Sequence, residues 1–206
     1  MSNKKSYSET ATKTPIIKDE VSHLSKEELM EQHELSRLPF AAVCVNISDE
    51  RTLDSIIRSA ATLGCEAVYV YTNNALHKAE TTAEGVREFQ AVDHISIDTV
   101  DNGGKLDDED AYEVVLQCLE YFGYTPFGLA EGGTDIASID FTVVESPCIV
   151  LGSDDAGLPA YLKERLPLLS ITPTGIIRSV DAAAAAAIAM SHIQRQFIPP
   201  AGLFKL

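Results

Sequence analysis

The sequence predicts an α/β fold in which a mainly parallel sheet is flanked by helices. Short, continuous apolar runs of strand length recur along the chain, and such runs are typical of strands buried on both faces. Segments with apolar residues at helical spacing lie between them. Strands that alternate with helices in this way build parallel sheets covered by helices.

The main domain starts with a strand, a helix and a second strand. Residues 40–46 are apolar up to Asn46 and predict a buried strand. The helix ends at Gly64, whose missing Cβ suits a left-handed cap, and its apolar stripe consists of Leu53, Ile56, Ile57, Ala60 and Leu63. Residues 67–71 predict the next strand.

The remaining elements are predicted from the same two patterns. Helices are expected at residues 82–89, 108–122 and 179–197, and strands at residues 94–97, 126–130, 148–151 and 168–172. Six consecutive alanines make the last helix a strong one. We expect Ser179 to cap that helix, with Asp181 in its first turn.

Three parts of the chain differ in composition. Residues 1–20 are rich in serine, threonine and lysine and hold few large apolar side chains, so we expect a mobile tail. Residues 21–38 are expected to form an extension with a short helix at about residues 26–36, and residues 39–206 one domain. A chain of 206 residues is long enough to bury one sizeable core.

Charge is the strongest departure from average composition. With 16 basic and 31 acidic residues the formal net charge is −15, which argues against a protein that coats nucleic acid through bulk attraction. Residues 93–140 contain twelve of the acidic residues and a single cation, Lys105. We interpret this stretch as a solvated face, because its carboxylates do not follow a calcium-loop pattern.

Common catalytic motifs and metal-ligand spacings are absent from the sequence. It contains no phosphate-binding loop, no serine-nucleophile motif and no zinc-protease motif, and its five histidines are scattered. Its four cysteines are isolated within apolar segments, so we expect no metal site and no disulfide framework. Because neither a membrane-spanning tract nor a signal-peptide core is present, we expect a cytoplasmic protein without a membrane partner.

Three polar segments follow predicted strands, at the edge where open α/β sheets bind ligands. The first holds Arg58, on the helix after the first strand. The second, residues 151–157 (LGSDDAG), offers two glycines and two carboxylates, and the third, residues 172–183, leads into the alanine-rich helix. Taken singly, the first segment is typical of a solvated arginine, the second of a strand-to-helix turn and the third of a helix cap.

The order and spacing of these segments resemble the three motifs of the SpoU (TrmH-like) branch of the SPOUT RNA methyltransferases. RTLDSIIRSAATLG places Arg58 at the family's arginine, and CIVLGSDDAGL places Asp154 at its glutamate. SITPTGIIRSVDAAAAAAIAM matches the third motif with Ile171, Ser179 and Asp181, and the resemblance covers residues 40–197. Four residues depart from the family pattern: Thr52 for asparagine, Asp54 for glycine, Asp154 for glutamate and Asp181 for asparagine.

This resemblance implies a fold with a carboxyl-terminal trefoil knot that forms the pocket for S-adenosylmethionine. Leu129, Gly152, Ile171 and Ser179 match family positions that line this pocket. The resemblance also implies a homodimer with the site at its interface. The reaction it implies is methyl transfer to a ribose 2′-hydroxyl of tRNA or rRNA, without a metal.

For this reaction the resemblance assigns catalytic roles to Arg58, Asp154, Ser179 and Asp181. A guanidinium with a pKa above ~12 is a poor base, so we expect Arg58 to grip a phosphate and to stabilise developing negative charge. Asp154 would orient Arg58 or the substrate, and Ser179 and Asp181 would position the ribose or their own loop. The four departures leave an alternative open, namely a catalytically silent relative that binds RNA or the ribosome.

Overall fold

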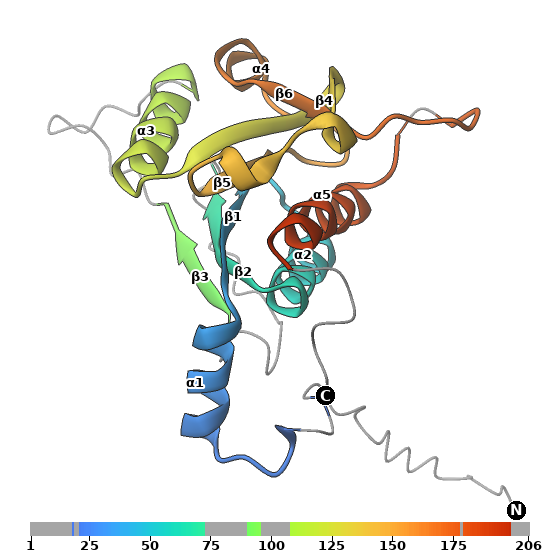
Figure 1. Ribbon diagram of the computed structural model, residues 1–206. Coiled ribbons are helices and arrows are strands. Elements are labelled where there is room, and N and C mark those ends of the chain that lie inside the picture. Colours follow the sequence, from blue (N-terminus) through green and yellow to red (C-terminus); the bar gives the residue numbers. More distant parts are fainter. Residues whose placement is uncertain (1–17, 19–20, 73–89, 96–107, 178, 199–206) are drawn as a thin grey trace, which may run out of the picture.

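A computed structural model describes residues 18, 21–72, 90–95, 108–177 and 179–198. Within them lies a six-stranded sheet in which every strand pair is parallel. Helices cover both faces of this sheet (Figure 1). The predicted α/β fold and its parallel sheet are therefore confirmed.

An α-helix separates β1 from β2, β3 from β4 and β5 from β6, so the predicted alternation is seen in three of the connections between strands. The strands are β1 (Leu38–Val45), β2 (Cys65–Tyr71), β3 (Ala91–His94), β4 (Thr125–Asp135), β5 (Pro147–Leu151) and β6 (Leu168–Ser170). The α-helices are α1 (Lys26–Ser36), α2 (Glu50–Leu63), α3 (Asp108–Tyr121), α4 (Ala160–Arg165) and α5 (Ala182–Phe197). Two short 3-10 helices follow β4, at Ile136–Ser138 and Phe141–Val143.

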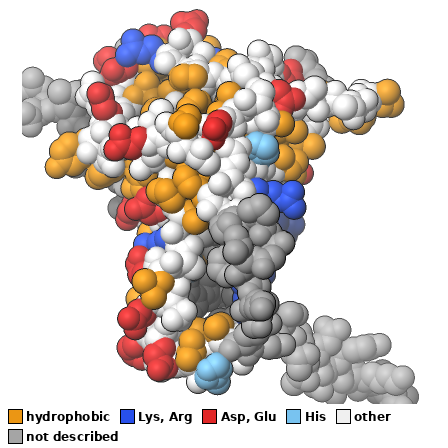
Figure 2. All heavy atoms as spheres, in the orientation of Figure 1, with side chains coloured by type: hydrophobic (Ala, Val, Ile, Leu, Met, Phe, Trp, Pro, Cys, Tyr) orange, Lys and Arg blue, Asp and Glu red, His pale blue; other side chains and the backbone are white. Residues whose placement is uncertain are grey.

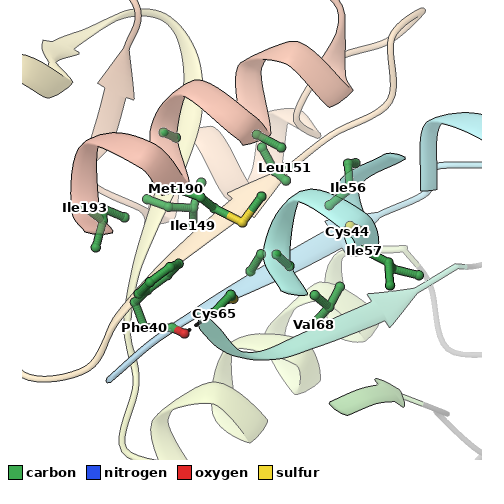
Figure 3. Packing of buried hydrophobic residues seen from close by; sticks show 14 of the residues in the cluster. Phe40, Cys44, Ile56, Ile57, Cys65, Val68, Ile149, Leu151, Met190 and Ile193 are labelled. Atoms are coloured by element: carbon green, nitrogen blue, oxygen red, sulfur yellow. Dashed lines mark hydrogen bonds between the residues drawn. The ribbon is translucent and has the colours of Figure 1, made fainter. Parts of the chain in front are cut away.

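The strand order β3-β2-β1-β5-β4-β6 places β1 and β5 at the centre, with a hydrophobic core on each face of the sheet. On one face α2 and α5 pack together, and Ile56, Ile149 and Met190 lie among its fully buried side chains (Figure 3). On the other face α3 and α4 bury residues such as Val115 and Leu162. Because both faces are covered, the polar groups that face a ligand lie at an edge of the sheet.

The helix α2 ends where its sequence predicts and buries four of the five residues of its predicted stripe. Asp49 caps its first turn by accepting a hydrogen bond from the backbone N–H of Thr52 at 2.8 Å. Gly64 ends the helix in the left-handed conformation, with a φ of 74°. The predicted stripe is buried at Leu53, Ile56, Ile57 and Ala60.

The helix α1 matches the short helix expected in the extension. Ser25 and Glu28 form a reciprocal capping box at its start. No residue of α1 is buried, and the helix projects from the sheet with acidic side chains along it (Figures 1 and 2). The limits of the three expected parts of the chain stay a prediction. The expected helix at 82–89 and most of the expected tail at 1–20 lie outside the described residues.

Two strands differ from their predicted positions. The strand expected at residues 94–97 lies at Ala91–His94, because pairing with β2 aligns Ala67 with Ala91. The strand expected at residues 126–130 continues to Asp135, because Gly133 approaches the backbone of Leu168 so closely that a Cβ would meet it at 2.6 Å. That approach lets β4 resume its pairing with β6 after an irregularity.

The start of the last helix is also later than predicted. Ser179 does not cap it, because α5 begins at Ala182 and Asp181 is the capping residue. The Asp181 carboxylate accepts a hydrogen bond from the backbone N–H of Ala184 at 2.8 Å. Helix α4 and the two 3-10 helices were not predicted from the sequence.

Candidate functional site

An open pocket lies at the carboxyl end of the sheet, where the three polar segments were expected to meet. Its volume is about 1100 Å³, at the upper end of the size range of small-molecule sites. The irregular part of β4 (129–132), the loop after β5 (151–158) and residues 170–177 and 179–182 between β6 and α5 form its walls. The two segments from the carboxyl-terminal half of the chain therefore share one site.

Six of the seven predicted site residues line this pocket: Leu129, Gly152, Asp154, Ile171, Ser179 and Asp181. The seventh, Arg58, does not line the pocket of its own chain. It is exposed on α2 and lies away from the buried stripe of that helix.

Asp154 connects all three polar segments. Its Oδ1 accepts a hydrogen bond from the backbone N–H of Ala182, at the start of α5. Its Oδ2 lies 3.3 Å from the hydroxyl of Thr52, and it shares the single hydrogen of that hydroxyl with Asp49, which lies closer, at 2.9 Å. Since Thr52 lies in the first turn of α2, one carboxylate joins α2, the loop after β5 and α5.

Carboxylates hold the starts of both helices at this edge. The backbone N–H and the hydroxyl of Thr52 donate to Asp49, at 2.8 and 2.9 Å, and these bonds lower the pKa of the Asp49 carboxyl. Asp181 caps α5 by accepting a hydrogen bond from the backbone N–H of Ala184. A negative charge at a helix start is favourable because the N-terminal end of the helix dipole is positive. Asp181 thus has a structural task as well as its place in the pocket wall.

Two glycines shape the loop after β5. A Cβ on Gly152 would lie 2.1 Å from the backbone carbon and oxygen of Gly157, so no larger residue fits without moving the backbone. Gly157 has a φ of 66° and donates its N–H to the Ser153 carbonyl at 2.8 Å. The loop is therefore a tight turn whose exposed backbone forms part of the pocket.

The wall next to β6 is fixed by polar contacts that sequence analysis missed. The hydroxyl of Ser170 donates to the Gly133 carbonyl at 2.9 Å. The hydroxyl of Thr172 donates to the carboxylate of Asp135, and this bond lowers the pKa of Asp135. No short motif marks these residues, because the contacts join positions 37 residues apart.

The charged side chains of the described pocket wall are mostly acidic. Its carboxylates are those of Glu131, Asp154, Asp155 and Asp181, and the cation among its described residues is Lys163. Lys163 lies on α4, a helix that the sequence did not predict. An acidic wall favours a positively charged ligand.

A metal site is not seen in the part of the chain that the structure describes. This part contains no group of three or more histidine, cysteine or acidic side chains that could hold a metal ion. Cys44, Cys65 and Cys148 are buried free thiols, and burial raises the pKa of Cys44 to about 12. None of the described helices has the length and apolar character needed to cross a membrane.

Comparison with known families and structures identifies the chain. Its residues 39–191 match the SpoU rRNA Methylase family. The chain belongs to this family. The matched range includes α2, the loop after β5 and most of α5, and so all seven predicted site residues. A search of curated proteins found no match.

Solved structures share the SpoU-family fold with this chain. A TrmH/SpoU tRNA modifying enzyme from A. aeolicus matches with a TM-score of 0.65 and 16% identity over 84% of each chain. The SpoU methyltransferase AviRb from Streptomyces viridochromogenes, in complex with AdoMet, matches with a TM-score of 0.59 and 19% identity over 79% of this chain and 58% of its own. A structure that concerns the 2-OH methylation of C/U34 on tRNA matches with a TM-score of 0.60 and 19% identity over 78% of this chain and 98% of its own.

Proposed function

We propose that this SpoU-family protein transfers a methyl group from S-adenosylmethionine to a ribose 2′-hydroxyl of tRNA or rRNA. The strongest support is the position of Asp154, which accepts a hydrogen bond from Ala182 and contacts the hydroxyl of Thr52, so that the three motif segments meet at the pocket. Two similar structures agree with this proposal: AviRb in complex with AdoMet, and the structure that concerns the 2-OH methylation of C/U34 on tRNA. Action on tRNA or rRNA also fits the expected cytoplasmic location.

The pocket residues fit the methyl donor. The donor carries a positive sulfonium, and acidic residues outnumber the one lysine in the described wall. Leu129 and Ile171 offer half-buried apolar side chains, Gly152 offers bare backbone, and Ser179 offers a hydroxyl. These four residues are assigned to cofactor binding. When bound, S-adenosylmethionine supplies the methyl group.

The chain's own task in this reaction is to align the ribose oxygen and to ease the loss of its proton. Ser179 and Asp181 lie in the pocket wall, where they would position the ribose or their own loop. Asp154 would hold the segments in register through its two bonds. Arg58 would grip a phosphate and stabilise negative charge on the oxygen.

A homodimer belongs to this proposal, because Arg58 does not line the pocket of its own chain. An arginine supplied by a second chain would complete the site. The segment between β6 and α5 projects from the body with apolar side chains at its tip (Figures 1 and 2). Near it, Ile177, Val180 and Ile188 are 72%, 50% and 41% exposed, which suits burial against another copy.

The trefoil knot is a further part of the proposal. Strand β6 lies at one edge of the sheet, yet α5, which follows it, packs against α2 beside the central strand β1. The connecting segment, residues 171–181, therefore passes the loop after β5 on its way, and Asp154 bonds to its end. This course is the one that the resemblance implies for the knot.

A catalytically silent relative that binds RNA or the ribosome is the second candidate function. It is favoured by the bonds of Asp154 and Asp181, because both carboxylates already serve at the start of α5. The two functions differ in whether bound cofactor is ever consumed.

Labelled methyl transfer separates the two candidates. Purified protein is incubated with bulk tRNA and rRNA and methyl-labelled S-adenosylmethionine, and the RNA is digested to nucleosides for mass spectrometry. We expect 2′-O-methyl nucleosides, a rate about 100-fold lower for Arg58→Ala, and no loss for Arg195→Ala, an exposed arginine near the end of α5. Cofactor binding without any methylated ribose would favour the silent relative, and methyl groups on a base would contradict the proposed reaction.

A further inference from the structure

We propose that Lys163 binds the carboxylate at the amino-acid end of the methyl donor. This inference rests on the proposed function, because it takes S-adenosylmethionine as the ligand. Lys163 lines the pocket, and among the described residues its ammonium forms no ion pair or hydrogen bond. A cation that lines a pocket without a protein partner is available to a ligand.

The position of the ammonium places it against the loop after β5. The Nζ of Lys163 lies 4.0 Å from the point that a Cβ on Gly157 would occupy. The same loop holds Gly152, which is assigned to the cofactor, and Asp154. The charge of Lys163 is therefore part of the pocket wall.

The next cation on α4 shows a different arrangement. Arg165 pairs with Glu113 at 2.9 Å, and its guanidinium lies 5.7 Å from the centre of the Tyr161 ring. Both cations suit the last turn of α4, where the helix dipole is negative. Only the one that faces the pocket lacks a partner within the described part of the chain.

The charges of the wall favour the donor over RNA as the partner of Lys163. Near neutral pH, S-adenosylmethionine has a sulfonium, an amino group that is largely protonated and one carboxylate. The described wall offers carboxylates for the positive groups and one ammonium for the negative group. Unlike the donor, an RNA phosphate brings no positive group to offset the repulsion from Glu131, Asp154, Asp155 and Asp181.

Calorimetric titration with two ligands tests this inference. Wild-type protein, Lys163→Ala and Lys163→Arg are each titrated with S-adenosylmethionine and with its decarboxylated analogue. We expect Lys163→Ala to bind S-adenosylmethionine about tenfold more weakly than the wild type, and to bind the analogue as the wild type does. Lys163→Arg should keep most of the affinity, and Arg195→Ala, the matched control, all of it.

Two results would overturn the assignment of Lys163. The first is unchanged affinity of Lys163→Ala for S-adenosylmethionine; if the same variant binds tRNA more weakly, Lys163 contacts a phosphate instead. The second is an equal loss of affinity for both ligands, which would indicate a structural effect. If the folded wild type bound neither ligand, the proposed function itself would fail, and this inference with it.

Discussion

The hydroxyl of Thr52 lies 3.3 Å from Oδ2 of Asp154, although 102 residues separate them in the sequence. Both side chains depart from the SpoU motif pattern, which has asparagine and glutamate at these positions. The two departures therefore meet in a single contact. The other oxygen of Asp154 holds the N–H of Ala182, so the contact keeps α2 and α5 in register at the pocket.

Removal of the Asp154 carboxylate is predicted to destabilise the protein. Asp154→Ala loses the hydrogen bond from Ala182, the shared contact with the Thr52 hydroxyl, and the favourable charge at the start of α5. We expect the free energy of unfolding to fall by about 1 kcal/mol in urea titrations. The control is Asp155→Ala, the exposed neighbour, which should change stability by less than about 0.5 kcal/mol. Equal effects of the two variants would contradict the connecting role of Asp154.

Addition of a methyl group at Gly152 is predicted to be far more damaging. In Gly152→Ala the new Cβ would overlap the backbone of Gly157, and the loop after β5 would have to move. We expect loss of about 3 kcal/mol or more of stability, and loss of S-adenosylmethionine binding in any protein that still folds. Gly175→Ala is the control for stability, because a Cβ there meets nothing within 4 Å. Normal cofactor binding by folded Gly152→Ala would show that the loop is not part of the cofactor site.

The side chain of Gln196 is predicted to fix α5 to the segment after β4. Its Oε1 accepts a hydrogen bond from the Phe141 N–H at 2.7 Å, and its Nε2 donates to the Ile139 carbonyl at 2.9 Å. Gln196→Ala leaves both partly buried backbone groups unpaired and should cost about 1–3 kcal/mol in chemical unfolding. Gln194→Ala, on the same helix, serves as the control and should cost less. A reversed order would count against this contact.

Stability at low pH is predicted to depend on Asp49. Its hydrogen bonds from Thr52 lower its pKa from the ordinary value of 3.8. A carboxyl whose pKa is lower in the folded state stabilises the fold above its unfolded pKa, and this contribution is lost as the pH falls below 3.8. Asp49→Ser keeps a capping oxygen but cannot titrate, so its stability should fall less on acidification than that of the wild type.

Urea unfolding at neutral pH and at about pH 3 measures this difference. Asp49→Ala, which has no capping oxygen, should be less stable than Asp49→Ser at neutral pH. The same loss on acidification in the wild type and in Asp49→Ser would contradict a role for the Asp49 charge.

Local sequence predicted the elements whose boundaries are set by local physics. The apolar stripe and the left-handed Gly64 are sufficient to define α2, and the continuous apolar runs define β1 and β5. The end of α3 is marked in the same way by Gly123, which has a φ of 81°. These features depend on neighbours within a few residues, so the boundaries of each element can be predicted from its own segment of the sequence.

Contacts between distant segments decided the rest. Ser179 and Asp181 are both good capping residues, and the local sequence does not distinguish them. In the fold, Asp154 binds the N–H of Ala182 and Asp181 binds that of Ala184, which together set the start of α5. The long β4 likewise depends on the close approach of Gly133 to Leu168.

The candidate site was predictable in its members and not in its geometry. The family resemblance assigned Leu129, Gly152 and Ile171 to one pocket. Gly152 and Ile171 follow the ends of parallel strands, and Leu129 lies where the pairing of β4 with β6 is interrupted. The direction of Arg58 depends on how α2 packs on the sheet, and a side chain on its exposed face cannot be assigned to a pocket by spacing. Lys163 was missed since α4 is only six residues long and has no strong pattern.

A crystal structure of the protein with S-adenosylmethionine tests most directly whether this pocket is the methyl-donor site. We predict density for the donor between Leu129, Gly152 and Ile171, with the carboxylate of the donor directed toward Lys163. Density at another place on the chain, or none at a saturating concentration of the donor, would contradict the assignment of the pocket.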